Sequence, residues 1–183
     1  MNPTAATTLS PAFERARKLS RLMAMLFTIG FWLTLAGVVV ILFAPFVDSF
    51  KTGHSFLQIN DIQVELKGTM SLWPRLWIVL AMEMAARPVL FLMHHARRVF
   101  GHFARGEVFA AAPIAHMRQA GLWLIGSFFL GIVANILLRA SHAVPPSQLQ
   151  SNAWPLFTGI ATTIAAYVMA EARRIADENA SIL

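Results

Sequence analysis

The sequence contains no cysteine, so neither a disulfide framework nor a thiolate metal site is possible. It is also poor in charge. Asp, Glu, Lys and Arg make up 13% of the 183 residues, whereas a soluble domain carries about 25%. Hydrophobic residues reach 57% and the mean hydropathy is +0.59. This composition favours a membrane protein that forms one compact unit.

Four apolar segments are long enough to cross a bilayer as helices, given about 1.5 Å per residue and a hydrocarbon core of about 30 Å. They are residues 22–46, 76–93, 120–138 and 153–170. The first is too long for a signal-peptide core and follows a polar segment, 1–21, so we expect a retained helix. The predicted fold is an all-α integral membrane protein with four transmembrane helices and a small β-hairpin in its first extracytoplasmic loop.

The distribution of Lys and Arg predicts the orientation. Ten of them lie on the side shared by segments 1–21, 94–119 and 171–183, and four lie in segments 47–75 and 139–152. The positive-inside rule then places both termini in the cytoplasm. The net charge of +6 is explained by this topology, which argues against direct nucleic-acid binding and leaves the lipid bilayer as the main environment.

The hairpin is predicted from alternation in "SFLQINDIQVEL". A two-residue turn at Asn60-Asp61 sets Ile59 opposite Ile62 and Leu57 opposite Val64 on one face. We expect that face to pack on the outer helix ends. The second outer segment, 139–152, is interpreted as a Pro-rich polar connector.

Small and hydroxyl residues recur at helix-packing spacing in three of the predicted spans. The sets are Gly30 with Thr34, Ser127 with Gly131 and Asn135, and Gly159 with Thr163. Because apolar lipid gives no hydrophobic drive between helices, such residues allow close backbone approach. They predict interhelical contacts, and they could equally serve a homo-oligomer.

Glu83 and Arg87 are charged residues inside the second span. They are four apart, so they share a helical face and can pair. Pro88 follows and removes one helical hydrogen bond. Intramembrane ionisable residues are candidate functional sites, and with Asn135 these two are the intramembrane candidates. A structural pair, a ligand or ion site and a protein contact are the three interpretations.

The cytoplasmic segment 94–119 is expected to form a helix end, a turn and a helix start. Gly106 suits the left-handed conformation that ends a helix, and Pro113 suits the first turn of the next one. Four aromatic or apolar residues are expected to tuck between the helix ends: Phe100, Phe103, Val108 and Phe109. Four histidines also lie here, His94, His95, His102 and His116. No carboxylate completes a familiar site, so we predict no metal and no cofactor.

The stretches "RRVFGHFARGEVF" and "HMRQAGLWL", followed by the ending "YVMAEARRIADENASIL", resemble an uncharacterised bacterial membrane family, domain-of-unknown-function family 2975. The positions that carry the resemblance are Gly106, Phe109, Arg118, Gly121, Glu171, Glu178 and Asn179. The family has no established activity. Some members are encoded beside small helix-turn-helix regulators, which implies a membrane protein that holds or releases a DNA-binding partner.

Our first hypothesis is a structural or signalling protein that acts on a protein partner through its cytoplasmic surface. The candidate surface residues are Arg97, Arg98, Phe100, Arg105, Gly106, Phe109, Arg118, Glu171, Arg173 and Arg174. The opposing interpretation is that they lock helix ends together, through pairs such as Arg118 with Glu171. The second hypothesis is a small oligomeric transporter, channel or ligand-binding protein that uses Glu83 and Arg87. An enzyme is not predicted, because the sequence has no nucleophile–base order, nucleotide loop or thiol.

Overall fold

The computed structural model describes residues 11–43, 55–59, 62–66, 71–141 and 152–181. Four helices make up most of this part of the chain: α1 Pro11–Phe43, α2 Leu72–Arg105, α3 Ala111–Ala140 and α4 Trp154–Ala180. Two short strands, β1 Ser55–Ile59 and β2 Ile62–Leu66, lie between α1 and α2.

All four helices are long and apolar enough to cross a membrane. They contain 33, 34, 30 and 27 residues. At about 1.5 Å per residue each is longer than a hydrocarbon core of about 30 Å. Every predicted span falls in a different helix. Residues 44–46 of the first span lie outside the described residues, and residue 153 of the fourth precedes α4. The helices therefore extend past the predicted spans, most of all α2 and α1, at the end of the bundle that holds the α2–α3 turn.

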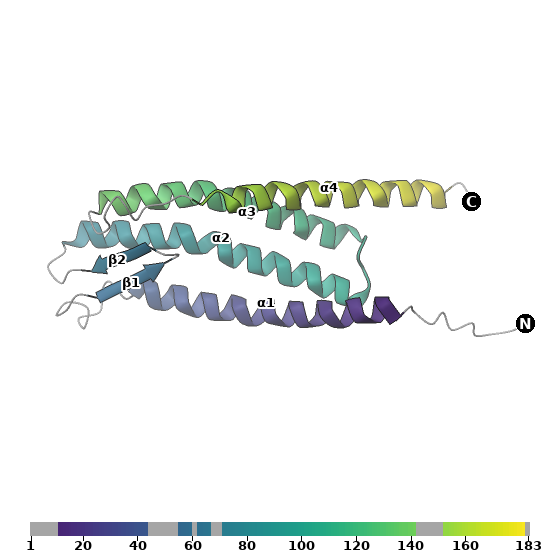
Figure 1. Ribbon diagram of the computed structural model, residues 1–183, viewed down its shortest axis with the longest axis horizontal. Coiled ribbons are helices and arrows are strands. Elements are labelled where there is room, and N and C mark those ends of the chain that lie inside the picture. Colours follow the sequence, from purple (N-terminus) through teal and green to yellow (C-terminus); the bar gives the residue numbers. More distant parts are fainter. Residues whose placement is uncertain (1–10, 44–54, 60–61, 67–70, 142–151, 182–183) are drawn as a thin grey trace, which may run out of the picture.

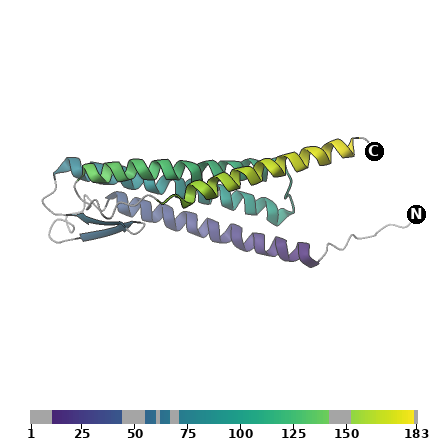
Figure 2. The same ribbon diagram turned by 45° about the horizontal axis from the view of Figure 1, so that its top comes forward.

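The helices form an elongated bundle in which each packs mainly on its neighbours in the chain. α2 packs on both α1 and α3, and α4 packs on α3. The start of α1, the α2–α3 turn and the end of α4 lie at one end of the bundle, and the strands lie at the other (Figure 1). The turned view in Figure 2 shows the same arrangement. Four antiparallel passes thus bring the segments predicted to be cytoplasmic to the same end.

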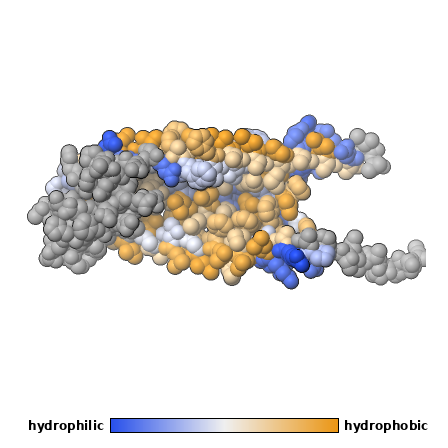
Figure 3. Space-filling model, in the orientation of Figure 1, coloured by the Kyte–Doolittle hydropathy of each residue, from blue (hydrophilic) through white to orange (hydrophobic). Residues whose placement is uncertain are grey.

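An apolar surface covers the middle of the bundle, and hydrophilic ends of α1 and α4 extend beyond it (Figure 3). Large hydrophobic side chains stay accessible along every helix, such as Leu33, with 69% of its surface exposed. A soluble protein rarely leaves so continuous an apolar surface open to water. The pattern fits a chain whose side chains face lipid.

The two strands pair antiparallel, with Leu57 opposite Val64 and Ile59 opposite Ile62. These are the two pairs that alternation along the strands singled out. The turn at residues 60–61 lies outside the described residues, as do the side chains of both strands. The expected packing of the apolar face on the helix ends therefore stays a prediction.

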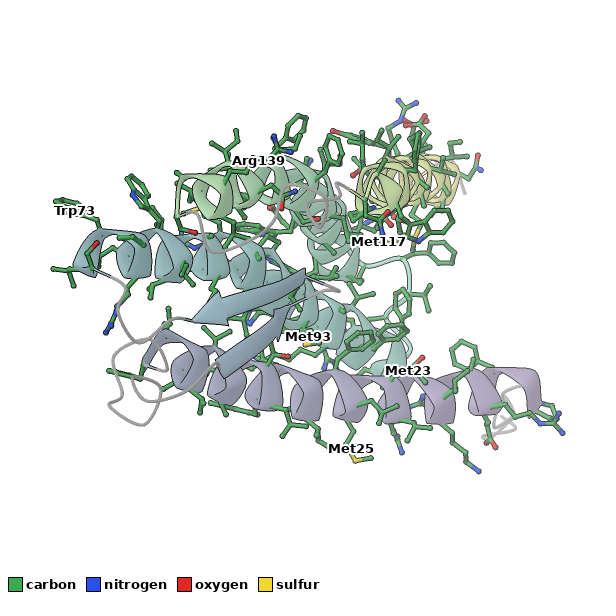
Figure 4. The ribbon with its side chains drawn as sticks, turned by 60° about the vertical axis from the view of Figure 1, so that its left-hand side comes forward. Met23, Met25, Trp73, Met93, Met117 and Arg139 are labelled. Carbon is green, nitrogen blue, oxygen red and sulfur yellow. The ribbon has the colours of Figure 1, made fainter. Side chains whose placement is uncertain are left out.

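Two of the three predicted small-residue contacts are confirmed. The Thr34 hydroxyl of α1 donates to Sδ of Met93 at 3.5 Å, and Met93 lies between α1 and α2 (Figure 4). On α4, a Cβ at Gly159 would lie 2.7 Å from the carbonyl oxygen of Gly121 in α3. On α3, in contrast, a Cβ at Gly131 would meet no described atom within 4 Å. The Ser127–Gly131 face therefore does not contribute a close helix contact within the described bundle.

Candidate functional site

We use the name inner end for the end of the bundle that holds the α2–α3 turn, where α2 stops at Gly106. Its φ of 86° is left-handed, and its backbone N–H donates to the carbonyl of Phe103 at 3.0 Å. The next N–H, of Glu107, donates to the carbonyl of His102 at 3.1 Å. These bonds satisfy carbonyls that the end of a helix leaves free. The predicted end of the helix at Gly106 is confirmed, and so is the place of Pro113 in the first turn of α3.

The side chain of Glu107 ties the turn back to α2. Its Oε2 lies 2.6 Å from Nδ1 of His102, and its Oε1 accepts a hydrogen bond from Nε of Arg105 at 3.3 Å. The hydrogen bond to His102 and then the one to Arg105 hold the pKa of Glu107 below its usual value. The carboxylate is solvent-exposed, so this network orders the turn more than it stabilises the whole protein.

α1 packs against this end of α2 through residues between Arg17 and Phe31. Nε of Arg17 donates to the carbonyl of Ala104 at 3.2 Å. Farther along α1, the rings of Phe27 and Phe100 stack with centroids 5.6 Å apart. The guanidinium of Arg97 lies 4.7 Å from the centre of the Phe31 ring, a cation–π distance. Arg97 and Phe100 are thus part of the α1–α2 contact.

Histidines line the contact between α2 and α3 at the same end. Nδ1 of His95 lies 3.2 Å from Nδ1 of His116, so one ring must donate and the other accept. Both residues lie in segment 94–119, outside the predicted spans. Burial, followed by charge from neighbouring histidines, lowers the pKa of His95, and burial followed by His102 and Arg98 lowers that of His116. Within the described ranges, these histidines do not belong to a group that could hold a metal ion.

Phe109 projects from the turn, with 59% of its surface exposed. The expectation that it tucks between helix ends is therefore wrong, whereas Phe100, Phe103 and Val108 of the same set are partly buried. Three arginines on the same end are also exposed, Arg98, Arg105 and Arg118. We call these four residues the inner surface. An aromatic ring among cations is a common composition for protein contact sites.

The inner end of α4 carries its own ion pairs. Nη2 of Arg174 lies 2.5 Å from Oε1 of Glu171, and Nε of Arg173 lies 3.4 Å from Asp177. The pair of Arg118 with Glu171, by which the helix ends could have been locked together, is not formed in the described structure. Glu171 and Arg174 instead remain exposed on the projecting helix, at the hydrophilic end seen in Figure 3.

The intramembrane candidates do not converge on one site. Glu83 and Arg87 pair on α2, with Nη2 to Oε1 at 2.6 Å, and 30% and 48% of their side-chain surfaces are exposed. Asn135 lies half-buried on α3 and has an interaction of its own. α2 continues as a helix through Pro88. The charged pair therefore lies on a partly uncovered face of the bundle.

Several contacts at the inner end were not predicted from the sequence. The bond from Arg17 to Ala104 joins residues 87 apart in the chain, and no local pattern signals it. The sequence shows that His95 and His116 both belong to a cluster of histidines, but their pairing depends on how α2 packs on α3. The ring stack of Phe91 on Trp123, with centroids 4.2 Å apart, likewise follows from that helix pairing.

Comparison with known proteins finds no match among protein-family models, curated proteins or solved structures. The resemblance to domain-of-unknown-function family 2975 therefore stays a prediction, and the geometry of the inner end is the main support for any functional proposal.

Proposed function

We propose that the chain is an integral protein of a bacterial inner membrane, with both termini in the cytoplasm and the strands outside, that recruits a cytoplasmic protein to its inner surface. Four apolar helices with their basic segments gathered at one end support the membrane part. The role is structural or signalling and involves no chemical step.

The observation that carries the proposal is the exposed Phe109 at the end of the bundle where Arg98 and Arg118 are exposed as well. Arg98 and Arg118 are exposed and make no hydrogen bond or ion pair with any described residue. Interfaces favour aromatic and Arg side chains as anchors. The surface fits a partner segment with an apolar residue flanked by carboxylates. The resemblance suggests that this partner is a transcriptional regulator.

Photocrosslinking from the inner surface tests the proposal. A photoreactive phenylalanine analogue at position 109, in cells, is expected to give an adduct with a cytoplasmic protein. The matched control is the same analogue at Leu33, which is exposed on the apolar face of α1 and is expected to give no such adduct.

Charge reversal adds specificity to this test. The double variant Arg98→Glu and Arg118→Glu is expected to reduce the adduct at position 109 at least about tenfold, since like charges at a contact are strongly unfavourable. An adduct of unchanged yield, or none at position 109 in the native background, would contradict recruitment through this surface.

A further inference from the structure

The Glu83–Arg87 pair is bonded on one side only. Nε and Nη2 of Arg87 both donate to the same oxygen, Oε1 of Glu83, at 2.9 and 2.6 Å. From the described residues, Oε2 of Glu83 accepts no hydrogen bond, and Nη1 of Arg87 donates none. The pair therefore keeps one strong acceptor and several N–H donors for groups outside the bundle.

The pair lies near the middle of the apolar part of α2. Glu83 lies seven residues from Leu76 and ten from Met93, the two ends of the predicted span, which is about 10 and 15 Å along the helix. At this depth the hydrocarbon offers no hydrogen-bond partner to the free acceptor and donors. The face therefore needs either another protein surface or a hydrated cavity beside it.

The surrounding residues form a helix-pairing seam. Leu76, Leu80, Glu83 and Arg87 follow one another at spacings of four, three and four residues. This is the repeat by which two helices pack in a left-handed coil, where an occasional polar residue fixes the register. Leu76 and Leu80 are 39% and 40% exposed, so the described helices leave this seam partly uncovered.

We propose that a second copy of this chain covers the seam, with α2 packed against its twofold-related mate. The inference rests on α2 crossing the membrane, which is part of the proposed function. Two copies inserted with the same orientation are related by an axis along the membrane normal. Because Arg87 reaches back to Glu83, both charged heads lie at one depth. The axis then brings two carboxylates and two guanidiniums together as an alternating ring.

Charge complementarity selects a second copy over other occupants. The face carries one acid and one base, so it is complementary to itself. In the ring, each free Oε2 accepts from the mate's guanidinium, and each guanidinium uses N–H groups that its own chain leaves free. A different protein would need a matching intramembrane pair, and lipid tails offer neither group.

Single-cysteine crosslinking tests the contact, since the chain has no cysteine of its own. Leu80→Cys in isolated membranes is expected to form a disulfide-linked dimer on mild oxidation, because residues on the seam meet their mates across the axis. Leu33→Cys, on the exposed face of α1, is the matched control and is expected to stay monomeric. A monomeric Leu80→Cys, equal crosslinking of both variants, or an adduct of another mass would overturn the proposal.

Variants with exchanged charges distinguish a contact between the charged pairs of two copies from a pair that acts only within one chain. In the Leu80→Cys background, Glu83→Arg gives a copy with two bases, and Arg87→Glu gives one with two acids. Each alone is expected to lose most of its dimer, at least about tenfold, because like charges meet across the axis. Co-expressed with different tags, the two are expected to regain a mixed dimer. The ring does not exist if each variant expressed alone keeps its dimer and co-expression gives no excess of the mixed dimer.

Extraction with alkaline carbonate on the same membranes distinguishes the two proposals. A chain that resists extraction but gives no Leu80→Cys dimer keeps the membrane proposal and overturns the dimer. A chain that is extracted overturns both. The photocrosslink at position 109 reports on partner recruitment independently of either result.

Discussion

Gly121 of α3 and Gly159 of α4 lie backbone to backbone, with no room for a methyl group on either. A Cβ at Gly159 would lie 2.7 Å from the carbonyl oxygen of Gly121 and 2.7 Å from the amide nitrogen of Ile125. A Cβ at Gly121 would lie 2.9 Å from the carbonyl oxygen of Gly159. The Thr163 hydroxyl obstructs a Cβ at Gly121 as well. At Gly159 the two nearest obstructing atoms are backbone, so they cannot move aside as a flexible side chain could. Close packing of this kind replaces the hydrophobic drive that helices lack in lipid.

We predict that Gly159→Ala destabilises the α3–α4 contact by about 1–3 kcal/mol, the usual cost of overpacking. The measurement is thermal unfolding in detergent micelles, followed by tryptophan fluorescence. Gly126→Ala is the matched control, since its Cβ would meet no described atom within 4 Å. Alanine is there expected to be neutral or to stabilise α3 by up to about 1 kcal/mol. Equal midpoints for Gly159→Ala and the native chain would rule out the close approach.

The contact between α2 and α3 is expected to weaken in acid. Burial and neighbouring charge lower the pKa of His95 and His116 in the folded chain below the ordinary value of 6.5. A lowered histidine pKa means that the folded state favours the neutral ring. That stability is present above the unfolded pKa and is lost as the pH falls through the folded values. The groups that oppose protonation are His94, His102 and Arg98.

Unfolding midpoints of the native chain should therefore fall between pH 7.5 and pH 5, and those of His95→Gln should fall less. Glutamine keeps a hydrogen-bonding group near Nδ1 of His116 but does not titrate. The same comparison can be made with His116→Gln. An equal pH dependence in all three proteins would show that the histidine pair does not contribute to it.

The number of the helices and the place of their apolar parts could be predicted because lipid imposes a simple rule on sequence. A helix in hydrocarbon needs a long run of side chains that tolerate it, and the four runs are continuous in the chain. The end of α2 at Gly106 was also predictable, since a left-handed residue there favours glycine. In each of these cases the signal lies within a few neighbouring residues.

The inner end was harder to predict because its contacts join distant segments. The opposing interpretation paired Arg118 with Glu171, yet Glu171 bonds Arg174 on its own helix, three residues away, where no assembly is needed. Phe109 was expected to tuck inward, yet it is exposed, whereas Phe100 stacks on Phe27 between α1 and α2. Which aromatic residue becomes exposed depends on how the helices pack on one another, and composition does not determine that packing.

Gly106→Ala is expected to destabilise the α2–α3 turn by about 1–2 kcal/mol, because a side chain in the left-handed region clashes with the backbone. The φ of 86° imposes this strain whatever the space around it. Gly106→Asn should cost less, since asparagine tolerates this conformation better. The measurement is the unfolding midpoint of each variant. The ring of Phe13 lies 3.5 Å from the position of the new Cβ. Similar losses of stability for alanine and asparagine would indicate that contact with this ring matters more than φ.

The orientation of the bundle gives the prediction on which recruitment depends. Glu14→Cys on α1 and Asn179→Cys on α4 are both exposed at the end that holds the α2–α3 turn, so we expect both to be shielded from a membrane-impermeant thiol reagent in intact cells. Trp73→Cys, at the opposite end (Figure 4), is expected to be labelled and serves as the accessible control. Since the native chain has no cysteine, each signal comes from one position. If residues 14 and 179 are labelled and residue 73 is shielded, Phe109 lies outside the cell, where no cytoplasmic partner could reach it. If only one of residues 14 and 179 is labelled, the number of membrane crossings is odd.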